Sequence, residues 1–572
     1  MSVPFNGRVL IQPQVVTAVN TQALAPASPA TPYALALVGP ANQGPNQWVQ
    51  VQSVADIIAT LGADSDLANA AALALAPSPA TNGANPLLVY NVNPTTQGTL
   101  DLNNTATTPA ASIVCTTTRY GAAANQIKVA VSAGSQQGYK VSVGDDYSGQ
   151  VLTQDNIALP VLSLAYTGTT LTNVTATVTD SSFTVEAGAT PSQVFSISFS
   201  TATTVQQLVN QINQQAGFEA TLLDPNANDA TSGLFDNVTN VAITSTATTF
   251  SANVTAVVRS LNSGWQPWVT AVRQANATNL ATTGAWVYAS GGSTGTATTA
   301  NWQNAYTALQ QQYNVLWVVP VTPNSSYWAM NDAHCQYMAS LGYGRYGIVG
   351  GTAGTTVQQA LSNVASLKSE TTGYLVNGTT GTNLQGSSVT FPPYIVAAQL
   401  AAMAAGQPLN ESLTAKPVAA TGLEQSFADS TIDTLTAAGA IVLKQVPWSS
   451  VPVVVKGQST AAANPSGNED QIQLSAVQEQ FVLVRLINQA LQPFVGQPIT
   501  GTTAAKVQQT VFHTLMDAYT QQGLLAQAPT QQGISVSISG TVVTVTAQVA
   551  LTLPADFILT TLQATLPMAQ AA

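Results

Sequence analysis

The residues of this chain that could carry nucleophilic or acid–base chemistry are few and scattered. The sequence contains only two histidines, His334 and His513, and two cysteines, Cys115 and Cys335. A thiolate–imidazole pair needs both side chains within hydrogen-bond reach. His334 and Cys335 are neighbours on an expected helix, so their side chains point about 100° apart. His513 falls on the polar side of another expected helix, and we interpret both histidines as structural or solvated.

Other catalytic and metal-binding patterns are missing. A serine-protease triad needs a histidine, but neither histidine lies in a His-Gly-Thr-His context, and no Gly-Thr-Ser-Met or Gly-Thr-Ser-Ala segment occurs. Isolated histidines and cysteines do not give the clustered ligands of a metal site. The two cysteines are far apart, which predicts buried free thiols. We therefore expect no enzyme, no cofactor and no metal.

One glycine pattern resembles a nucleotide-binding fingerprint. Residues Gly342–Gly347 match G-x-G-x-x-G, but that fingerprint must follow a strand and open a helix. Here it follows an expected helix and leads into an expected strand. We predict a helix-to-strand turn, and the chain has no G-x-x-x-x-G-K-[ST] phosphate loop either.

Residues 285–351 indicate an α/β core. Apolar strand-like runs at 285–288, 315–319 and 346–351 alternate with amphipathic stretches, in one of which apolar residues recur at i, i+3, i+4 and i+7 from Trp302. Alternation of this kind is typical of a buried parallel sheet with helices packed on it.

Composition favours an assembly protein. The 572 residues exceed a single core, which stops growing at about 250–300 residues, and charged residues make up 6% of the chain against roughly 25% on average. Apolar content of 45% argues against disorder, and a nearly neutral surface favours self-association. The net charge of −11, without a basic run, disfavours nucleic-acid binding. The apolar windows are shorter than the roughly 20 residues of a membrane span, and the start of the chain lacks the features of a signal peptide.

The pattern along the chain predicts an α/β plus β protein with four parts. These are an N-terminal extended arm (1–28), an α/β core domain in two pieces (29–112 and 268–400), a β-rich outer insertion (113–267) and an α+β C-terminal assembly domain (401–572).

Both ends of the chain carry strand-like segments. The arm contains prolines, which suit an edge or extended strand, and the C-terminal segment 534–551 alternates apolar residues with serine and threonine around a turn at Ser539–Gly540. A two-stranded ribbon is marginal in water, so it should pair with strand 444–456, with another subunit, or with both. The candidate residues for strand exchange between subunits are Val9, Ile11, Val15, Val19, Val543, Val545, Val549 and Leu551.

Two amphipathic helices precede this ribbon. In the helix at 475–492 we expect Gln478 and Arg485 on the polar side and Val484 on the buried side. In the helix at 503–522 we expect His513 outside and Val511 inside.

Several segments together resemble one known family. They are a glycine-rich turn at 291–296, a helix start at Asn301–Trp302, a strand ending in Val-Val-Pro at 318–320, a helix with His334 and Met338 before Ile-Val-Gly-Gly at 348–351, a first strand and Gly-Pro turn at 34–45, and a Gly-x-x-x-Asn-x-Ile-x-Val strand at 121–129. These segments are similar to those of the contractile tail sheath proteins of bacteriophages and related injection machines.

The resemblance implies a subtilisin-like α/β core and a structural role. It implies a subunit that polymerises as a helical stack of rings around a tail tube protein, meets baseplate and tail terminator proteins, and contracts to drive the tube through the host envelope for genome delivery. Assembly would take place in the host bacterial cytoplasm, with no direct nucleic-acid contact and no membrane insertion. The arm and a C-terminal strand would pair with the C-terminal sheets of neighbouring subunits.

Three alternatives stay open. A phage-like contractile injection system would use the same subunit. An extracellular array or adhesin would share the Thr- and Asn-rich composition, but it would need an export signal. A degenerate subtilisin-like hydrolase would share the core, but it would need a His and Ser constellation.

Overall fold

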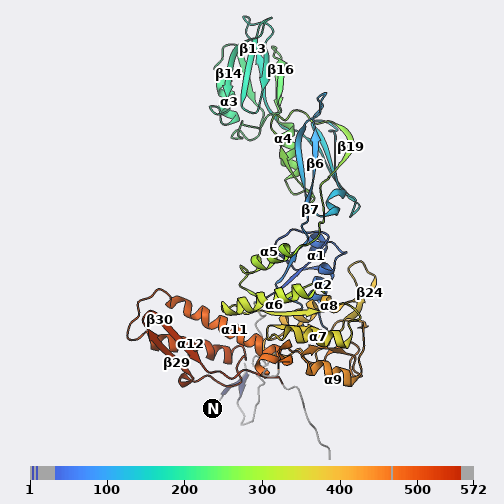
Figure 1. The fold of residues 1–572 in the computed structure, drawn as a ribbon. Coiled ribbons are helices and arrows are strands. Elements are labelled where there is room, and N and C mark those ends of the chain that lie inside the picture. Colours follow the sequence, from blue (N-terminus) through green and yellow to red (C-terminus); the bar gives the residue numbers. More distant parts are fainter. Residues whose placement is uncertain (1–2, 6–7, 11–32, 465–467, 555–572) are drawn as a thin grey trace, which may run out of the picture.

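A seven-stranded sheet forms the centre of the core (Figure 1). The computed structural model describes residues 3–5, 8–10, 33–464 and 468–554. In spatial order the sheet contains β26 (Ala440–Ile441), β22 (Thr372–Leu375), β21 (Tyr346–Gly350), β20 (Val315–Pro320), β3 (Ala34–Gly39), β5 (Leu87–Asn91) and β4 (Val49–Val51). All neighbours are parallel except β4 and β5. The α/β core predicted from the sequence is therefore present.

Helices cover both faces of this sheet. Leu35 and Leu37 of β3 pack with α2 and α8, whereas Ala36 and Val38 pack with α5. Burial on both faces explains why the strands are continuous apolar runs. The core helices are α1 (Val54–Leu61), α2 (Asp66–Leu75), α5 (Thr299–Leu309), α6 (Ser325–Ser340), α7 (Val357–Leu367), α8 (Pro393–Ala405) and α9 (Asp429–Ala437). A small sheet of β23 (Thr379–Thr382), β24 (Ser388–Phe391) and β25 (Gly422–Leu423) lies beside them.

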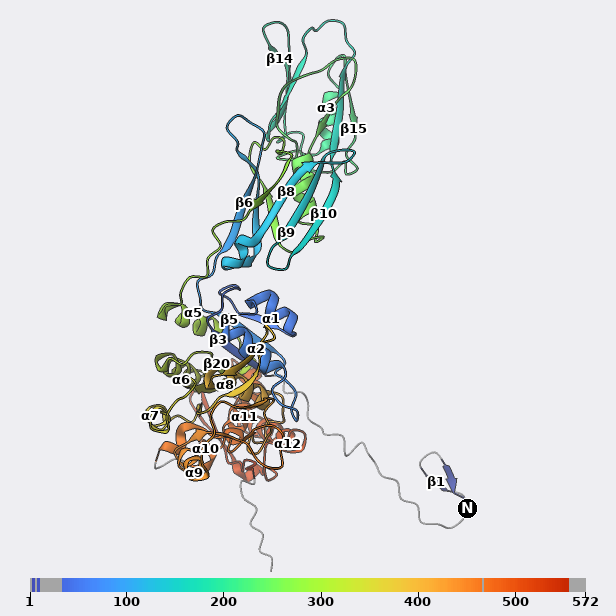
Figure 2. The ribbon, with the colours of Figure 1, turned by 90° about the vertical axis from the view of Figure 1, so that its right-hand side faces the viewer.

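The outer insertion leaves the core between β5 and α5 and extends away from it (Figures 1 and 2). Nearest the core are β6 (Gln97–Asn103), β7 (Ala111–Tyr120), β8 (Ile127–Ala133), β9 (Tyr139–Asp145), β10 (Gln150–Ile157), α4 (Asn253–Leu261), β18 (Val269–Arg273) and β19 (Thr283–Tyr288). The tip contains β11 (Pro160–Tyr166), β12 (Thr175–Val178), β13 (Ser182–Ala187), β14 (Ser192–Ser198), α3 (Val205–Ile212), β15 (Phe218–Leu222), β16 (Val238–Ala242) and β17 (Thr248–Ser251). Two separate apolar clusters fill these two parts.

Strand pairing moves the domain boundaries outward from those expected. The sheet β18-β7-β6 joins residues on both sides of the predicted limits at 113 and 267. β19 pairs antiparallel with β8 and is exposed along its whole length, so segment 285–288 does not belong to the buried parallel sheet. The apolar run Trp286–Tyr288 suggested a core strand, because composition alone does not distinguish an outer edge strand from a buried one. At the other end, β26 joins the core sheet from within the predicted C-terminal domain.

The C-terminal part packs against the lower side of the core in Figure 1. It contains β27 (Leu443–Lys444), β28 (Val453–Val454), α10 (Glu469–Ile472), α11 (Leu474–Leu491), α12 (Thr503–Thr520), β29 (Ile534–Ser539) and β30 (Val542–Ala547). On α12 the prediction is confirmed: Val511 is buried and His513 is exposed.

On α11 three residues depart from the predicted faces. Gln478 and Arg485 are buried, whereas Val484 is 44% exposed. Arg485 lies against the core, where its guanidinium donates to the carbonyls of Val315 (2.6 Å) and Gly344 (2.6 Å). The side chain therefore anchors α11 to the start of β20 and to the turn before β21. Helical periodicity alone does not show whether an arginine is buried in this way or exposed to solvent.

At the N-terminus, β1 (Val3–Phe5) and β2 (Arg8–Leu10) pair with each other as a short antiparallel hairpin. Among the residues that the structure describes, no helix is both long and apolar enough to cross a membrane.

Candidate assembly interface

The two histidines differ in their surroundings. His334 is buried, and its Nε2 lies 2.7 Å from a guanidinium nitrogen of Arg345. Burial and the Arg345 charge lower the pKa of His334 to about 3, so the ring is neutral and accepts this hydrogen bond. Arg345 also donates to the carbonyls of Leu309 and Gln312 at the end of α5. His334 therefore belongs to a structural cluster that closes a helix end.

Cys335 is buried, and burial raises its thiol pKa well above the ordinary value, which disfavours a reactive thiolate. Within the described residues, no group of three or more His, Cys, Asp and Glu side chains could hold a metal ion. The segment Gly342–Gly347 leads from the end of α6 into β21, which begins at Tyr346, so the predicted helix-to-strand turn is confirmed.

The loops beyond the carboxyl ends of β3 and β5, beside the position where doubly wound sheets bind ligands, hold the root of the outer insertion. Ligands in such sheets bind beyond the carboxyl ends of the strands, where the strand order reverses, which is between β3 and β20 in this protein. Asn91, at the end of β5, accepts from the backbone of Ala41 and donates to the carbonyl of Gln43. Asn93 accepts from the backbone of Ala297, where the chain returns from the insertion. These bonds tie both connections of the insertion to the loop after β3.

The β29–β30 hairpin has one apolar and one polar face. Ile534, Val536 and Ile538 stand directly opposite Ala547, Val545 and Val543, and these pairs share the face toward α12. Serines and threonines occupy most of the other face. Among the described residues the hairpin is a two-stranded sheet. It does not pair with the 444–456 segment, which folds back on itself as β27–β28, so that expected intrachain pairing is wrong.

The alternation of hydrogen-bonded and non-hydrogen-bonded residue pairs along the hairpin determines which backbone N–H groups face outward. The backbone N–H of Gln548 donates to the carbonyl of Gly533 at 2.9 Å, and these residues continue the β29–β30 register. Hydrogen-bonded pairs alternate with non-hydrogen-bonded pairs in an antiparallel ladder. Thr544 therefore bonds across the hairpin, whereas the N–H groups of Val543 and Val545 point away from β29.

The two outer edges of the hairpin are not equivalent. On the β29 side, the side-chain amide of Gln508 on α12 donates to the carbonyl of Ile534 at 2.7 Å and so takes one outward-facing acceptor. On the β30 side, no strand pairs with the outer edge within the described residues. An unpaired edge of this kind is a template for strand addition.

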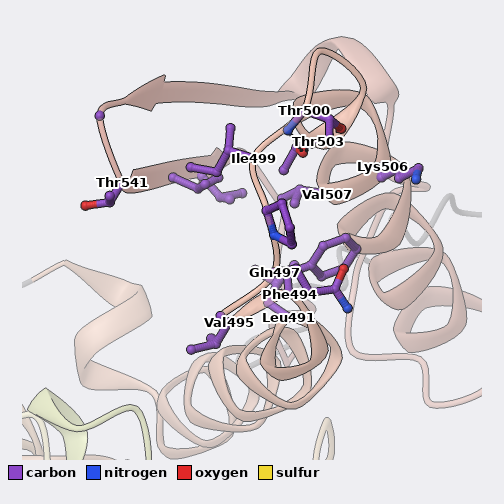
Figure 3. Close-up of a pocket in the computed structure, with 15 residues that line it drawn as sticks. Leu491, Phe494, Val495, Gln497, Ile499, Thr500, Thr503, Lys506, Val507 and Thr541 are labelled. Carbon is purple, nitrogen blue, oxygen red and sulfur yellow. Dashed lines mark hydrogen bonds between the residues drawn. The ribbon is translucent and has the colours of Figure 1, made fainter.

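A pocket of about 910 Å³ lies between this hairpin, the start of α12 and the loop that follows α11 (Figure 3). We call it the hairpin pocket. Its lining residues are Leu491, Phe494, Val495, Gly496, Gln497, Pro498, Ile499, Thr500, Thr503, Lys506, Val507, Gly540, Thr541, Val543 and Val545. Two of the most exposed large apolar side chains lie at or beside it: Val495 is 73% exposed and Val542 is 60% exposed. Exposed apolar patches of this kind mark interaction surfaces.

The residues predicted for strand exchange lie in different parts of the chain's structure. Val543 and Val545 lie on β30 with their side chains in the hairpin pocket. Val9 is on β2, opposite Pro4. Ile11, Val15 and Val19 lie outside the described residues.

Val549 and Leu551 depart from the predicted strand. β30 ends at Ala547, and Leu551 instead forms a bridge with Leu525 of the same chain. The next residue, Thr552, donates its backbone N–H to the Glu479 carboxyl group at 3.1 Å and its hydroxyl to the Gly523 carbonyl. The chain therefore folds back onto α11 after β30, because intrachain partners are available there. The sequence pattern did not indicate this, because Glu479 stands between two glutamines on α11.

Glu479 predicts a pH dependence of stability. It is fully buried on α11, and burial raises the pKa of its carboxyl group from 4.5 to about 8. Between these two values the folded chain keeps a proton that the unfolded chain has lost, so the free energy of unfolding falls as pH rises through this window. Glu479→Gln, which stays neutral, should remove a fall on the order of 3 kcal/mol. Urea unfolding of both proteins at pH 5 and pH 9 measures it, and an equal pH dependence would contradict the assignment.

Comparison with known proteins finds similar chains that are named as sheath proteins. No family model matches the chain. The chain is 24% identical over 578 residues to the tail sheath protein of Bacillus phage SP01, covering 97% of this chain and 96% of that protein. Its fold is similar to that of a sheath tail protein from Listeria innocua, with a TM-score of 0.56, 12% identity and coverage of 93% and 95% of the two chains. A sheath tail protein from Desulfitobacterium hafniense gives a TM-score of 0.53, 12% identity and coverage of 91% and 93%.

The resemblance to tail sheath proteins indicated by the sequence is therefore confirmed. The mixed α/β fold is that of these sheath tail proteins.

Proposed function

We propose that this chain is the structural subunit of a contractile tail sheath, which polymerises around a tail tube and contracts to drive that tube through a host envelope. The observation that carries the proposal is the unpaired outer edge of β30, with outward N–H groups at Val543 and Val545. It occurs in a chain similar to a phage tail sheath protein over 97% of its length. The partners would be further copies of the chain, the tube, the baseplate and the terminator, and the location would be the virion tail.

Strand addition at β30 is the proposed assembly contact. Main-chain hydrogen bonds give affinity without charged side chains, which suits a chain with 6% charged residues. The N-terminal segment with Val9, Ile11, Val15 and Val19 would supply the added strand from a neighbouring copy. It would join the β30 edge rather than the β29 edge, because Gln508 already bonds the carbonyl of Ile534.

The core and the outer insertion would have different tasks in this assembly. The core sheet, with helices on both faces, would move as a rigid unit while the strand connections persist. The outer insertion, which leaves the core through the asparagine-tied loops, would form the outside of the tube. The subtilisin-like character of the core stays a prediction.

The cations of the chain are largely used within the subunit. The chain has 13 Lys and Arg. Among the described residues, at least six of these side chains form ion pairs inside the chain, and Arg345 and Arg485 donate to backbone carbonyls. Few cations are thus available to pair with carboxylates of neighbouring subunits. We expect assembled tubes to persist from near-zero to about 1 M salt and down to about pH 4. Urea, which solvates apolar and peptide groups, should dissociate them.

Light scattering across salt, pH and urea series measures this stability. Sharp dissociation at moderate salt would show that the remaining charges concentrate at the interfaces. The function itself is tested by negative-stain microscopy of the purified protein, for which we expect hollow tubes or stacked rings. A monodisperse monomer at high concentration, also in the presence of the cognate tube protein, would contradict the proposed function.

A further inference from the structure

Trp448 is the most exposed large apolar residue among those that the structure describes. It lies in the short loop between β27 and β28, and 84% of its surface is accessible. Tryptophan is enriched in the energetic centres of protein interfaces, where it fills a pocket on the partner. An indole held on a loop that connects paired strands is therefore a candidate contact residue.

The hairpin pocket has the properties that would receive such a side chain. Most of the described residues that line it are apolar. Pockets of about 300–1,000 Å³ hold whole drug-sized ligands, so a pocket of about 910 Å³ has room for an indole and part of its loop.

The two features lie too far apart to meet within one chain. Lys444, on β27, forms an ion pair with Asp429 at the start of α9 (2.7 Å), which places the Trp448 loop beside α9. Figure 1 shows α9 and β30 on opposite sides of the C-terminal part. A contact between two different surfaces of the same chain is heterologous, and it generates rings or open helical filaments.

We propose that Trp448 of one copy inserts into the hairpin pocket of the next copy. This inference rests on the proposed sheath function and adds a second contact to it, distinct from strand addition at β30. The occupant is an identical chain, because the exposed indole, the apolar pocket and the opposite placement of the two features (Figure 1) fit one another. The contact is side-chain based, so a substitution at Trp448 leaves the backbone groups of β30 free to pair.

Site-directed cross-linking distinguishes this contact from other modes of association. Both native cysteines are buried, so cysteines introduced at exposed positions react selectively. One cysteine is introduced by Ser450→Cys, two residues from Trp448, so that the indole itself is unchanged. The other is introduced by Thr541→Cys at the tip of the hairpin (Figure 3). With a short bis-maleimide, assembled double variant should give a ladder of covalent oligomers. A mixture of the two single variants should stop at dimers, and each single variant alone should stay monomeric.

The controls test both the position and the side chain. Gln136→Cys, exposed in the outer insertion, combined with Thr541→Cys should give no ladder. Adding Trp448→Ala to the Ser450→Cys/Thr541→Cys variant should strongly reduce the ladder. Trp448→Ala alone should raise the concentration needed for assembly about tenfold or more, with an unchanged melting temperature, because the residue is exposed.

Each other outcome overturns the inference in a recognisable way. Dimers of Ser450→Cys alone would indicate a self-complementary contact. Tubes that form without a ladder, or that tolerate Trp448→Ala at wild-type concentration, would reject the Trp448 contact and leave the sheath function standing. Failure of the unmodified protein to form tubes at all would instead reject the proposed function.

Discussion

Replacing Val545 by proline should abolish tube formation while the subunit remains folded. The N–H of Val545 points to the outer edge of β30, away from β29, so proline removes a donor that only an added strand would use. Proline is tolerated on edge strands when its missing N–H faces outward. Electron microscopy should show no tubes, and amide exchange should still show protection in the hairpin.

The neighbouring residue provides a matched control. The N–H of Thr544 bonds across the hairpin toward Ser537, so Thr544→Pro should remove a hydrogen bond inside the hairpin and destabilise it by about 1–3 kcal/mol. This variant should also lose tubes, but it should lose protection in the hairpin as well. Normal tubes from Val545→Pro would show that the outer edge of β30 is not an assembly contact. Unfolding of the core in either variant would show that the hairpin belongs to the main folding unit.

Deleting residues 1–20 should also abolish assembly with little effect on the fold. The apolar alternation around Val9, Ile11, Val15 and Val19 needs a partner strand, and the core and insertion have their own buried clusters without this segment. Size-exclusion chromatography should show a soluble monomer with the melting temperature of the full chain.

A matched variant separates the length of this segment from its apolar pattern. Replacing only Val9, Ile11, Val15 and Val19 by serine keeps the length and should have the same effect as the deletion. If the truncated protein formed normal tubes, the N-terminal segment would not be the added strand, and the donor would have to be sought elsewhere in the chain.

The core could be predicted from the sequence because its strands are buried on both faces. Runs such as 34–39 and 315–320 are continuously apolar, and the alternating helices leave few other arrangements. The prediction for β19 was wrong because its apolar run resembles that of a core strand. Its actual hydrogen-bond partner is β8, and this pairing depends on contacts between residues that are distant in sequence.

The candidate interface was predictable only in part. The alternation in β29 and β30 indicated a hairpin with one apolar face, which is present. The burial of Arg485 and Glu479 could not be predicted, because a charged side chain on a helix is normally exposed to solvent. Only the folded structure shows the carbonyls that Arg485 contacts and the backbone N–H that Glu479 accepts from. The hairpin pocket could not be predicted either, because the segments that line it are separate in the sequence and come together only in the folded chain.

A reconstruction of assembled tubes by electron cryomicroscopy would test strand addition most directly. The β29–β30 hairpin should then appear as a larger sheet, with an extended strand from the N-terminal segment of a neighbouring copy paired to the outer edge of β30 beside Val543 and Val545. Tubes in which this edge faces solvent, and in which subunits meet only through the core or the outer insertion, would contradict the account.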